Sequence, residues 1–156
     1  MVAPKQVAIA ILYQAERYLL QLRDPLPTIV YPGQWGLFGG HLEVNETPED
    51  AIWRELSEEI GYAPPDLMAF TPYTDAEVVR HVFWGELTVP IETLNLQEGW
   101  DCGLLTLNEI DAGEAYSAIA QQVRPLGHVH RQILLNFHQQ RSSGFLGVSR
   151  PAERSP

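Results

Sequence analysis

The sequence predicts a single α/β domain built on a mixed β-sheet. Strand-like and helix-like segments interleave along the chain, which is the pattern of an α/β domain. A chain of 156 residues is most often one domain, and it buries enough surface for its core to need no disulfide or structural metal. We place the domain at residues 1–140. Residues 141–156 are polar, with glycine, serine and proline, and are expected to form a flexible C-terminal tail.

The first part of the domain predicts a hairpin followed by a loop. Lys5–Tyr13 contains a continuous apolar run typical of a buried strand, and Tyr18–Leu22 is its expected partner after a short polar break. Arg23–Gly33 contains three prolines and is expected to be a loop. Gln34–Phe38 is aromatic and apolar, which favours a short strand that leads into the glycine pair after it.

The strongest helix signals of the chain lie between Thr47 and Ile60. Thr47 is a suitable N-cap, and Pro48 occupies the first helical position, where its missing N–H group costs nothing. Acidic residues follow in the first turn, where they interact favourably with the helix dipole. Gly61 is placed to cap the C-terminal end. These signals predict a helix over Thr47–Ile60.

The second half of the domain continues the alternation of strands and helices. Three further segments are strand candidates: Leu67–Tyr73, Glu77–Leu87 and Gly99–Thr106. Asn108–Ala112 is expected to begin a short helix, and the region that continues to Gln122 is helix-prone. His130–Gln140 has apolar residues at helical spacing and predicts a last helix.

The charge balance bears on the class of ligand. The formal net charge is −10, from 20 acidic and 10 basic residues. A nucleic acid polymer is therefore not expected as a partner, because a polyanion needs a basic footprint. A small phosphorylated ligand stays open, since a bound divalent cation can invert the local field. The alternative is that the acidity mainly serves solubility.

Cysteine usage and hydropathy bear on location. Cys102 is the one cysteine of the sequence, which excludes an intramolecular disulfide and fits a reducing, intracellular setting. No stretch approaches the ~20 apolar residues of a membrane helix. The N-terminal apolar run lacks the cleavage pattern of a signal peptide. We expect a cytoplasmic protein with no membrane partner.

An acidic face on the Thr47–Ile60 helix is the candidate for chemistry. Glu55, Glu58 and Glu59 are spaced i, i+3 and i+4, so their directions fall within an arc of roughly 100°. A separate apolar stripe can anchor this helix on the sheet: Ile52, Leu56 and Ile60. One interpretation of the acidic face is a solvated helix surface. The other is a magnesium site, because Mg²⁺ binds through a few carboxylates together with substrate phosphates.

The residues around this helix follow a longer pattern. Gly40 is followed after five residues by Glu46, and seven residues later comes Arg54-Glu55-Leu56, then Glu58-Glu59 and Gly61-Tyr62. This pattern resembles the Nudix box, with Tyr62 in place of the usual final aliphatic residue. The preceding Phe38-Gly39-Gly40 differs from the Pro-Gly-Gly that is common before the box. The order of the surrounding strands and loops also resembles the Nudix family, from Lys5 to about Gln140.

The resemblance implies a Nudix-type three-layer α/β/α sandwich with a mixed β-sheet. It implies metal-dependent hydrolysis of the pyrophosphate bond of a nucleoside diphosphate linked to another moiety, with Mg²⁺, or alternatively Mn²⁺, as cofactor. By position, Glu55, Glu58 and Glu59 would bind the metal, and Glu55 or Glu59 would also help to deprotonate the water. Arg54 would orient the glutamates, through Glu46.

The resemblance also assigns roles to the glycine pair before the helix. The carbonyl group of Gly39 is a further candidate metal ligand. Gly39 and Gly40 would let the backbone approach the metal and the phosphates.

Two candidate residues lie outside the box. Glu98 is our candidate for the base or metal ligand that many family members place on a later loop, the alternative being an ordinary loop acid. Arg23 ends the second strand and is a candidate phosphate contact, the alternative being a surface charge. Both are included in the expected substrate-binding set with Gly39 and Gly40.

The substrate is left open by the sequence. Markers of the ADP-ribose and diadenosine polyphosphate subgroups are missing at the expected distance after the box, which disfavours both. Nucleoside triphosphates, oxidised nucleotides and nucleotide sugars remain as candidates. The rival hypothesis is a non-catalytic nucleotide-binding module on the same fold. The intact glutamate set favours the enzyme. The resemblance also makes a homodimer possible.

Overall fold

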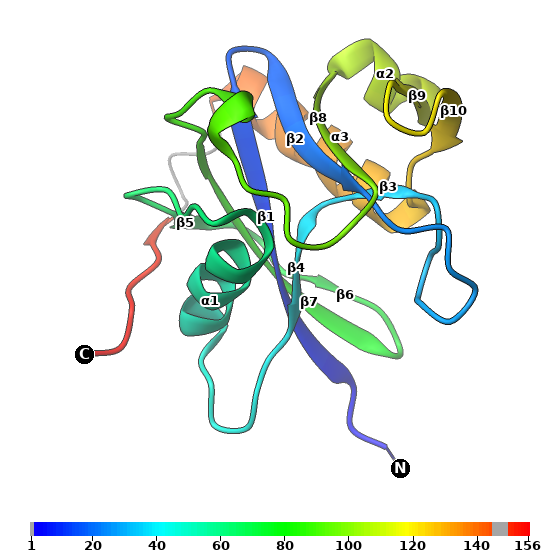
Figure 1. Cartoon of the computed structure of the whole chain (residues 1–156). Coiled ribbons are helices and arrows are strands. Elements are labelled where there is room, and N and C mark those ends of the chain that lie inside the picture. The colour runs from blue at the N-terminus through cyan, green and yellow to red at the C-terminus, as the bar shows by residue number, and fades with distance from the viewer. Residues whose placement is uncertain (1, 145–149) are drawn as a thin grey trace.

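The computed structural model describes residues 2–144 and 150–156, and a mixed β-sheet forms its middle layer (Figure 1). Within these residues one sheet has the strand order β11-β5-β7-β1-β2-β3, and β4, β6 and β8 pair with β1, β7 and β2. Its strands have the following bounds: β1 Lys5–Gln14, β2 Arg17–Leu22, β3 Trp35–Gly36, β4 Phe38–His41, β5 Met68–Ala69, β6 Tyr73–Thr74, β7 Val78–Glu86, β8 Asp101–Thr106 and β11 Arg150–Pro151.

The sheet is mixed because one central pairing is parallel. β1 runs parallel to β7, from Lys5 opposite Val78 to Tyr13 opposite Glu86, and antiparallel to β2 and β4. The hairpin of β1 and β2 is short, since the two strands pair only close to their turn, from Leu12 opposite Leu19 to Gln14 opposite Arg17. Beyond that, β1 pairs with β4 while β2 pairs with β3 and β8. The sheet therefore splits between β3 and β4.

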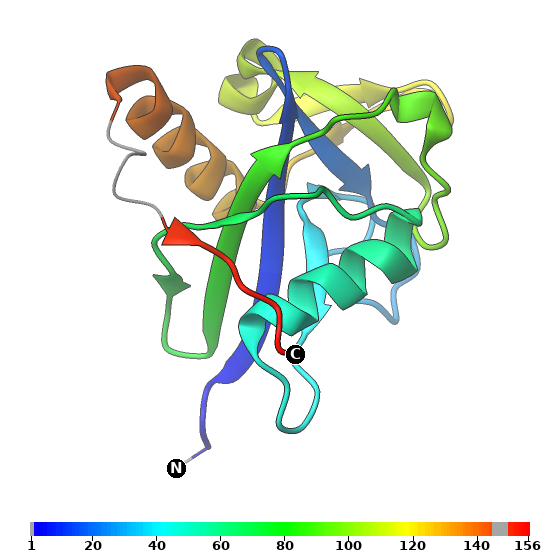
Figure 2. The same ribbon diagram turned by 90° about the vertical axis from the view of Figure 1, so that its left-hand side faces the viewer.

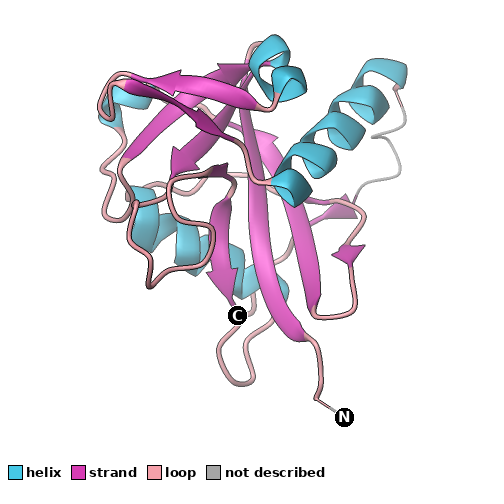
Figure 3. Cartoon of the chain, turned by 90° about the vertical axis from the view of Figure 1, so that its right-hand side faces the viewer, coloured by secondary structure: helices cyan, strands magenta, loops and turns pink. Residues whose placement is uncertain are grey.

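The helices cover both faces of the sheet (Figures 2 and 3). They are α1 (Pro48–Ile60), the 3₁₀ turn η1 (Ile91–Thr93), α2 (Leu107–Ala112) and α3 (His128–Ser143). α1 lies on one face, whereas α2 and α3 lie on the other, so the predicted three-layer α/β/α arrangement is confirmed. Among the described residues, no helix is both long and apolar enough to span a membrane.

Two hydrophobic cores fill the space between the layers. The apolar stripe of α1 is fully buried: Ile52, Leu56 and Ile60. On the opposite face, α3 buries Ile133, Leu134 and Phe137 against residues such as Ile9 and Ile11 of β1. Alternate residues of β1 therefore serve the two cores, as the period of a strand requires.

The region after α2 was predicted wrongly. α2 begins with a capping box formed by Thr106 and Glu109, and Gly113 ends it in a left-handed conformation with φ of 78°. The following residues were expected to be helix-prone up to Gln122. They form instead the two-stranded sheet of β9 (Glu114–Ser117) and β10 (Gln122–Pro125).

Two other segments, each predicted as one continuous strand, form two short strands in the structure. The predicted strand over residues 67–73 is reduced to β5 and the start of β6, which pair with different parts of β7. The predicted strand over residues 34–38 is divided between β3 and β4, because each half pairs with a different neighbour.

The C-terminal segment makes contacts in its described part. α3 continues to Ser143, beyond the predicted domain boundary, and Arg150–Pro151 pairs with β5. Further along, the N–H group of Ser155 donates to Asp50, and the guanidinium of Arg154 lies over the ring of Trp53. Figure 2 shows this red segment passing beside α1. The division into domain and tail stays a prediction.

Candidate active site

The position of α1 is fixed at both of its ends. The Thr47 hydroxyl accepts a hydrogen bond from the N–H group of Asp50 at 3.1 Å. Pro48 occupies the first turn, and Gly61 closes the helix with φ of 63° and donates to the Ser57 carbonyl. These are the caps that the sequence predicts. They set the register in which the glutamates leave the helix.

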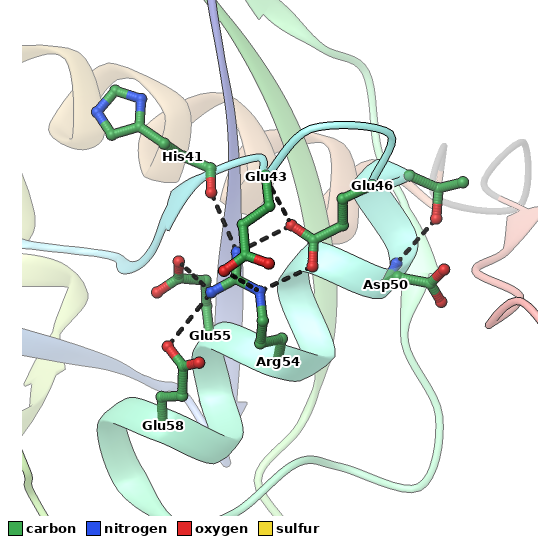
Figure 4. Close-up of polar contacts among 8 residues, drawn as sticks. His41, Glu43, Glu46, Asp50, Arg54, Glu55 and Glu58 are labelled. Atoms are coloured by element: carbon green, nitrogen blue, oxygen red, sulfur yellow. Dashed lines mark hydrogen bonds and ion pairs between the residues drawn. The ribbon is translucent and has the colours of Figure 1, made fainter.

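Arg54 is the centre of a polar network between α1 and the loop before it (Figure 4). Its Nε and Nη2 donate to the two carboxylate oxygens of Glu46 at 2.7 and 2.9 Å. Its Nη1 donates to Glu55 at 3.0 Å and to Glu58 at 3.2 Å. Nη2 also reaches the carbonyl of His41 at the end of β4. The geometry agrees with the role of orienting the glutamates that the resemblance implies for Arg54.

The network also shifts protonation equilibria. Hydrogen bonding to Arg54 lowers the pKa of Glu46, and hydrogen bonding to Glu46 raises the pKa of Arg54. Both groups therefore stay charged at neutral pH. The two-pronged contact is the kind that a planar guanidinium makes with a carboxylate.

Glu59 is the enclosed carboxylate of the site. It is 4% exposed, accepts a hydrogen bond from the N–H group of Gly39 at 3.0 Å, and accepts another from the side-chain amide of Gln21 at 3.1 Å. Burial raises its pKa, and the neighbouring charge of Glu55 raises it further. Two carboxylates thus lie close together where water cannot screen them well, so a cation between them would be stabilising.

The glycine pair is required by close backbone approach. A Cβ atom on Gly40 would lie 2.5 Å from a carboxylate oxygen of Glu55. Gly39 has φ of 146°, and a Cβ atom there would collide with the carbonyl of Ala8. Only glycine allows β4 to pair with β1 and to lie against the acidic helix at once.

The three glutamates are not equivalent. Glu55 and Glu59 are turned towards β4, the strand that contains Gly39 and Gly40. The side chain of Glu58 is instead 59% exposed and accepts a hydrogen bond from Arg54. Within residues 2–144 and 150–156, no three His, Cys, Asp or Glu side chains converge as a ready-made metal site. The three glutamates therefore share one face of the helix, but the fold buries Glu59 and leaves Glu58 exposed.

The residues present nevertheless fit a magnesium ion. Mg²⁺ keeps several waters and usually takes one or two protein carboxylates together with substrate phosphates, so a complete protein cage is not required. Glu55 and Glu59 supply hard oxygen donors beside a backbone without side chains. Glu58, at the rim, is available to water or a second ion.

The two candidates outside the box are placed differently. Arg23 lines a cavity, with its Nε bound to the carbonyl of Val30 at 2.7 Å. Glu98 is exposed on the loop before β8. Its neighbour Gln97 donates its backbone N–H to the carbonyl of Glu59 at 2.8 Å, which brings the loop to the C-terminal end of α1. The role of Glu98 stays a prediction.

Gln21 and Arg80 were not identified from the sequence. Gln21 lies in β2 and is 4% exposed, and Arg80 lies in β7 and is 6% exposed. Both stand at inward positions of their strands, because Leu19 and Val82 share their respective faces by the two-residue period. A polar side chain at a core position of a strand is the signal that would have found them.

An acidic helix, fixed by an arginine against a glycine-containing strand of an α/β/α sandwich, defines the class of protein. The chain matches the family model of the NUDIX domain over residues 3–126 and belongs to the NUDIX family. It is similar to the nucleoside triphosphatase NudI of Escherichia fergusonii, with 47% identity over 51 residues, which are 33% of this chain and 36% of that protein. The match to NudI of Enterobacter sp. (strain 638) is 56% identical over 32 residues, covering 20% and 23% of the two chains. The matched segments thus span 36% and 23% of the length of these two relatives.

Solved structures share the fold. The MutT protein of Methanosarcina mazei Go1 superposes with a TM-score of 0.68 at 20% identity, over 90% of this chain and 98% of that one. The NUDIX domain of Shewanella oneidensis NrtR, complexed with ADP ribose, has a TM-score of 0.69 at 19% identity, over 90% of each chain. A bifunctional NMN adenylyltransferase/ADP ribose pyrophosphatase of Francisella tularensis, complexed with AMP and a Mn ion, has a TM-score of 0.65 at 21% identity, over 90% of this chain and 42% of that one.

Proposed function

We propose that the protein hydrolyses the pyrophosphate bond of a nucleoside diphosphate linked to another moiety, with Mg²⁺ as cofactor and Mn²⁺ as an alternative. The observation that carries the proposal is the pair of carboxylates of Glu55 and Glu59, which lie against the backbone of β4 at Gly39 and Gly40. The neighbour that binds AMP and a Mn ion supports the ligand class and the metal.

Each residue of the site has a definite task in this proposal. Bound Mg²⁺ would neutralise phosphate oxygens and acidify water. Glu55 and Glu59 would hold the cation, and one of them would accept a proton from the attacking water. Arg54 keeps Glu55 and Glu58 in place through its ion pairs. Gly39 and Gly40 allow the phosphates to approach the backbone.

A nucleoside triphosphate is the substrate that we favour. Relatives that match this chain at 47% and 56% identity over short segments are named nucleoside triphosphatases. Oxidised nucleotides and nucleotide sugars remain alternatives. The rival function, a nucleotide-binding module without catalysis, would leave the enclosed pair of carboxylates without a use.

The setting of the protein is part of the same proposal. We expect a cytoplasmic enzyme, since Cys102 is a free thiol. A small nucleotide is the partner. Nucleic acid polymers and membranes are not expected, and a homodimer remains possible.

The test is a panel of nucleoside triphosphates, oxidised nucleotides and nucleotide sugars with Mg²⁺, scored by phosphate release.

Glu58→Gln and Glu59→Gln should each lower kcat by at least about 100-fold, because even outer partners of metal sites contribute roughly 10–100-fold. Chelation of the metal should stop the reaction without unfolding the chain. Glu16→Gln, at an exposed site, is the control. Binding of nucleotides without turnover of any of them would favour the module instead.

A further inference from the structure

The side chain of Gln21 connects the sheet to the enclosed carboxylate of the site. Gln21 lies in β2 and is 4% exposed, and its side-chain nitrogen Nε2 donates to Oε2 of Glu59 at 3.1 Å. The two residues are 38 positions apart in the chain, so the packing of α1 on the sheet is what brings them together. Within the described part of the chain, Nε2 of Gln21 makes this hydrogen bond and no other.

The orientation of this amide follows from the chemistry of its partner. An ionised carboxylate only accepts hydrogen bonds, so the nitrogen of the amide and not its oxygen must face Glu59. The oxygen Oε1 then lies beside the loop before β8, where a Cβ atom on Gly99 would be 3.2 Å from it. Gly99 has φ of 99°, and the close approach of Gln21 is a second reason for glycine at this position.

Two strands hold the two oxygens of Glu59. Nε2 of Gln21 in β2 binds Oε2, and the backbone N–H of Gly39 in β4 binds Oε1 at 3.0 Å. A carboxylate offers about four acceptor sites, so each oxygen keeps a lone pair after these bonds are made. The plane of the carboxylate is therefore fixed while acceptor sites remain for a cation.

The other two glutamates are supported differently. Glu55 and Glu58 each accept a hydrogen bond from Arg54, which lies on their own helix and is also paired with Glu46. Glu59 is held instead by neutral donors of the sheet. A neutral amide orients a carboxylate without cancelling its charge, so the full negative charge of Glu59 stays available to a cation.

The loop before β8 packs against the same amide. The backbone N–H groups of Gln97 and Trp100 donate, at 2.8 Å each, to the carbonyls of Glu59 and Leu22. These bonds attach the loop to α1 on one side and to the strand of Gln21 on the other. Because Gln21 is almost fully buried beneath this loop, bulk water is a poor replacement for its amide as a donor to Glu59.

We propose that Gln21 is a positioning residue, whose amide holds the carboxylate of Glu59 in the orientation that binds the cation. The inference rests on the proposed function and adds a residue of the sheet to the machinery of the helix. Without the amide, Oε2 of Glu59 would lose its donor in a buried place, which is costly, and the carboxylate could turn about its remaining bond to Gly39. Groups that orient metal ligands contribute roughly 10–100-fold to metal affinity or activity.

The experiment measures binding of Mn²⁺ to the protein without nucleotide, by electron paramagnetic resonance, together with kcat and KM. Gln21→Met removes the donor and keeps the length of the side chain. We expect the Kd for Mn²⁺ to rise and kcat to fall by at least about tenfold each. KM for the nucleotide should stay within about twofold of the wild type, because Gln21 acts through Glu59 and not on the substrate.

Gln14→Met is the matched control. Gln14 ends β1, and its Nε2 donates to the carbonyls of Leu87 and Val89 at 3.1 and 3.0 Å. The variant therefore also removes a strand amide that donates within the protein. It should lower Tm and leave the Kd for Mn²⁺ and kcat as in the wild type, so a loss of stability alone is distinguished from a loss of positioning.

A double-mutant cycle tests whether Gln21 acts through Glu59. In the Glu59→Gln background, Gln21→Met should weaken Mn²⁺ binding by less than about twofold further. An equal loss in both backgrounds overturns the inference, and so does wild-type Mn²⁺ affinity in folded Gln21→Met. Both results leave the proposed function intact.

Two further outcomes have separate meanings. Hydrolysis of no nucleotide and no binding of Mn²⁺ by the wild type overturn the proposed function itself. Should Gln21→Met fail to fold, Gln21→Asn decides. Its amide is one methylene too short to reach Glu59, so it should weaken Mn²⁺ binding to the same extent, and wild-type affinity in Gln21→Asn would overturn the inference.

Discussion

The glutamate side chains of α1 differ in burial and in hydrogen-bond partners, although their spacing puts them on one face of the helix. Helix geometry puts Glu55, Glu58 and Glu59 on one face, and Arg54 donates two hydrogen bonds to Glu46 in the loop before the helix. The sheet then distinguishes them, because Glu59 is enclosed by Gly39 and Gln21 whereas Glu58 stays at the rim. Which glutamate is enclosed depends on a contact with β2 that no local spacing contains.

Burial of Glu59 has a consequence for stability in the absence of metal. Because burial and Glu55 raise its pKa, the folded state binds this proton more tightly than the unfolded state does. The resulting stabilisation is complete below the ordinary value, about 4.5, and is lost as the pH rises through the raised pKa. In chelator, the Tm of the wild type should therefore fall between about pH 5 and pH 8.

Matched variants isolate that effect. Glu59→Gln should show a weaker dependence of Tm on pH over the same range, and Glu58→Gln should follow the wild type because its side chain is exposed. Added Mg²⁺ should raise Tm most at the upper end of the range. A wild-type Tm with the same dependence on pH as that of Glu59→Gln would contradict the raised pKa.

The shape of the Arg54 side chain is as important as its charge. Its planar group contacts Glu46, Glu55 and Glu58 together, and lysine cannot reproduce that set of contacts. Arg54→Lys should lower kcat by roughly 10–100-fold, in line with other groups that orient metal ligands. Steady-state kinetics would show this, and Arg17→Lys is the control. Full activity of Arg54→Lys would mean that a positive charge alone is sufficient.

At the scale of elements, local signals predicted the helix that carries the site. The caps of α1 involve residues within a few positions of one another, so Thr47, Pro48 and Gly61 could be identified without the tertiary structure. The β9–β10 hairpin was missed for the opposite reason. Its path is set by remote contacts, including the bond from the N–H of Leu126 to Gly113 and the bridge between Leu126 and Trp35.

The contact between β4 and α1 gives a prediction at this scale. Gly40→Ala would place a methyl group against the carboxylate of Glu55, so we expect Glu55 to be displaced and the apparent affinity for Mg²⁺ to fall by at least about tenfold. Metal titrations of activity measure this. Gly103→Ala is the control, since its Cβ would make only ordinary contacts of 3.6 Å or more. Unchanged metal affinity in Gly40→Ala would show that Glu55 does not hold the ion.

For the whole molecule, the C-terminal segment connects the edge of the sheet with α1. β11 extends the sheet at β5, and the contacts of Arg154 and Ser155 reach the outer face of the helix. These contacts lie away from the glutamates, on the side of Trp53 and Asp50. We expect these contacts to stabilise the position of α1 and to have little effect on catalysis.

Removal of residues 150–156 should therefore lower stability and preserve catalysis. We expect a loss of about 1–2 kcal/mol, which for a chain of this length is a fall in Tm of roughly 2–8 °C. Thermal unfolding and kcat are measured on the same preparations, with Arg154→Ala as the intermediate case. A large loss of kcat with unchanged Tm would instead assign these residues to the site.

The sequence by itself determined the mixed α/β class, the ends of α1 to within one residue, and the spacing of its glutamates and arginine, because caps and i, i+4 neighbours are local relations. The tertiary structure decided which carboxylate is enclosed, how the sheet splits between β3 and β4, and that Arg23 and Arg80 meet at one cavity. These features arise from pairing between strands far apart in the chain. Such pairing is selected by packing of the whole core, and no short segment of sequence records it.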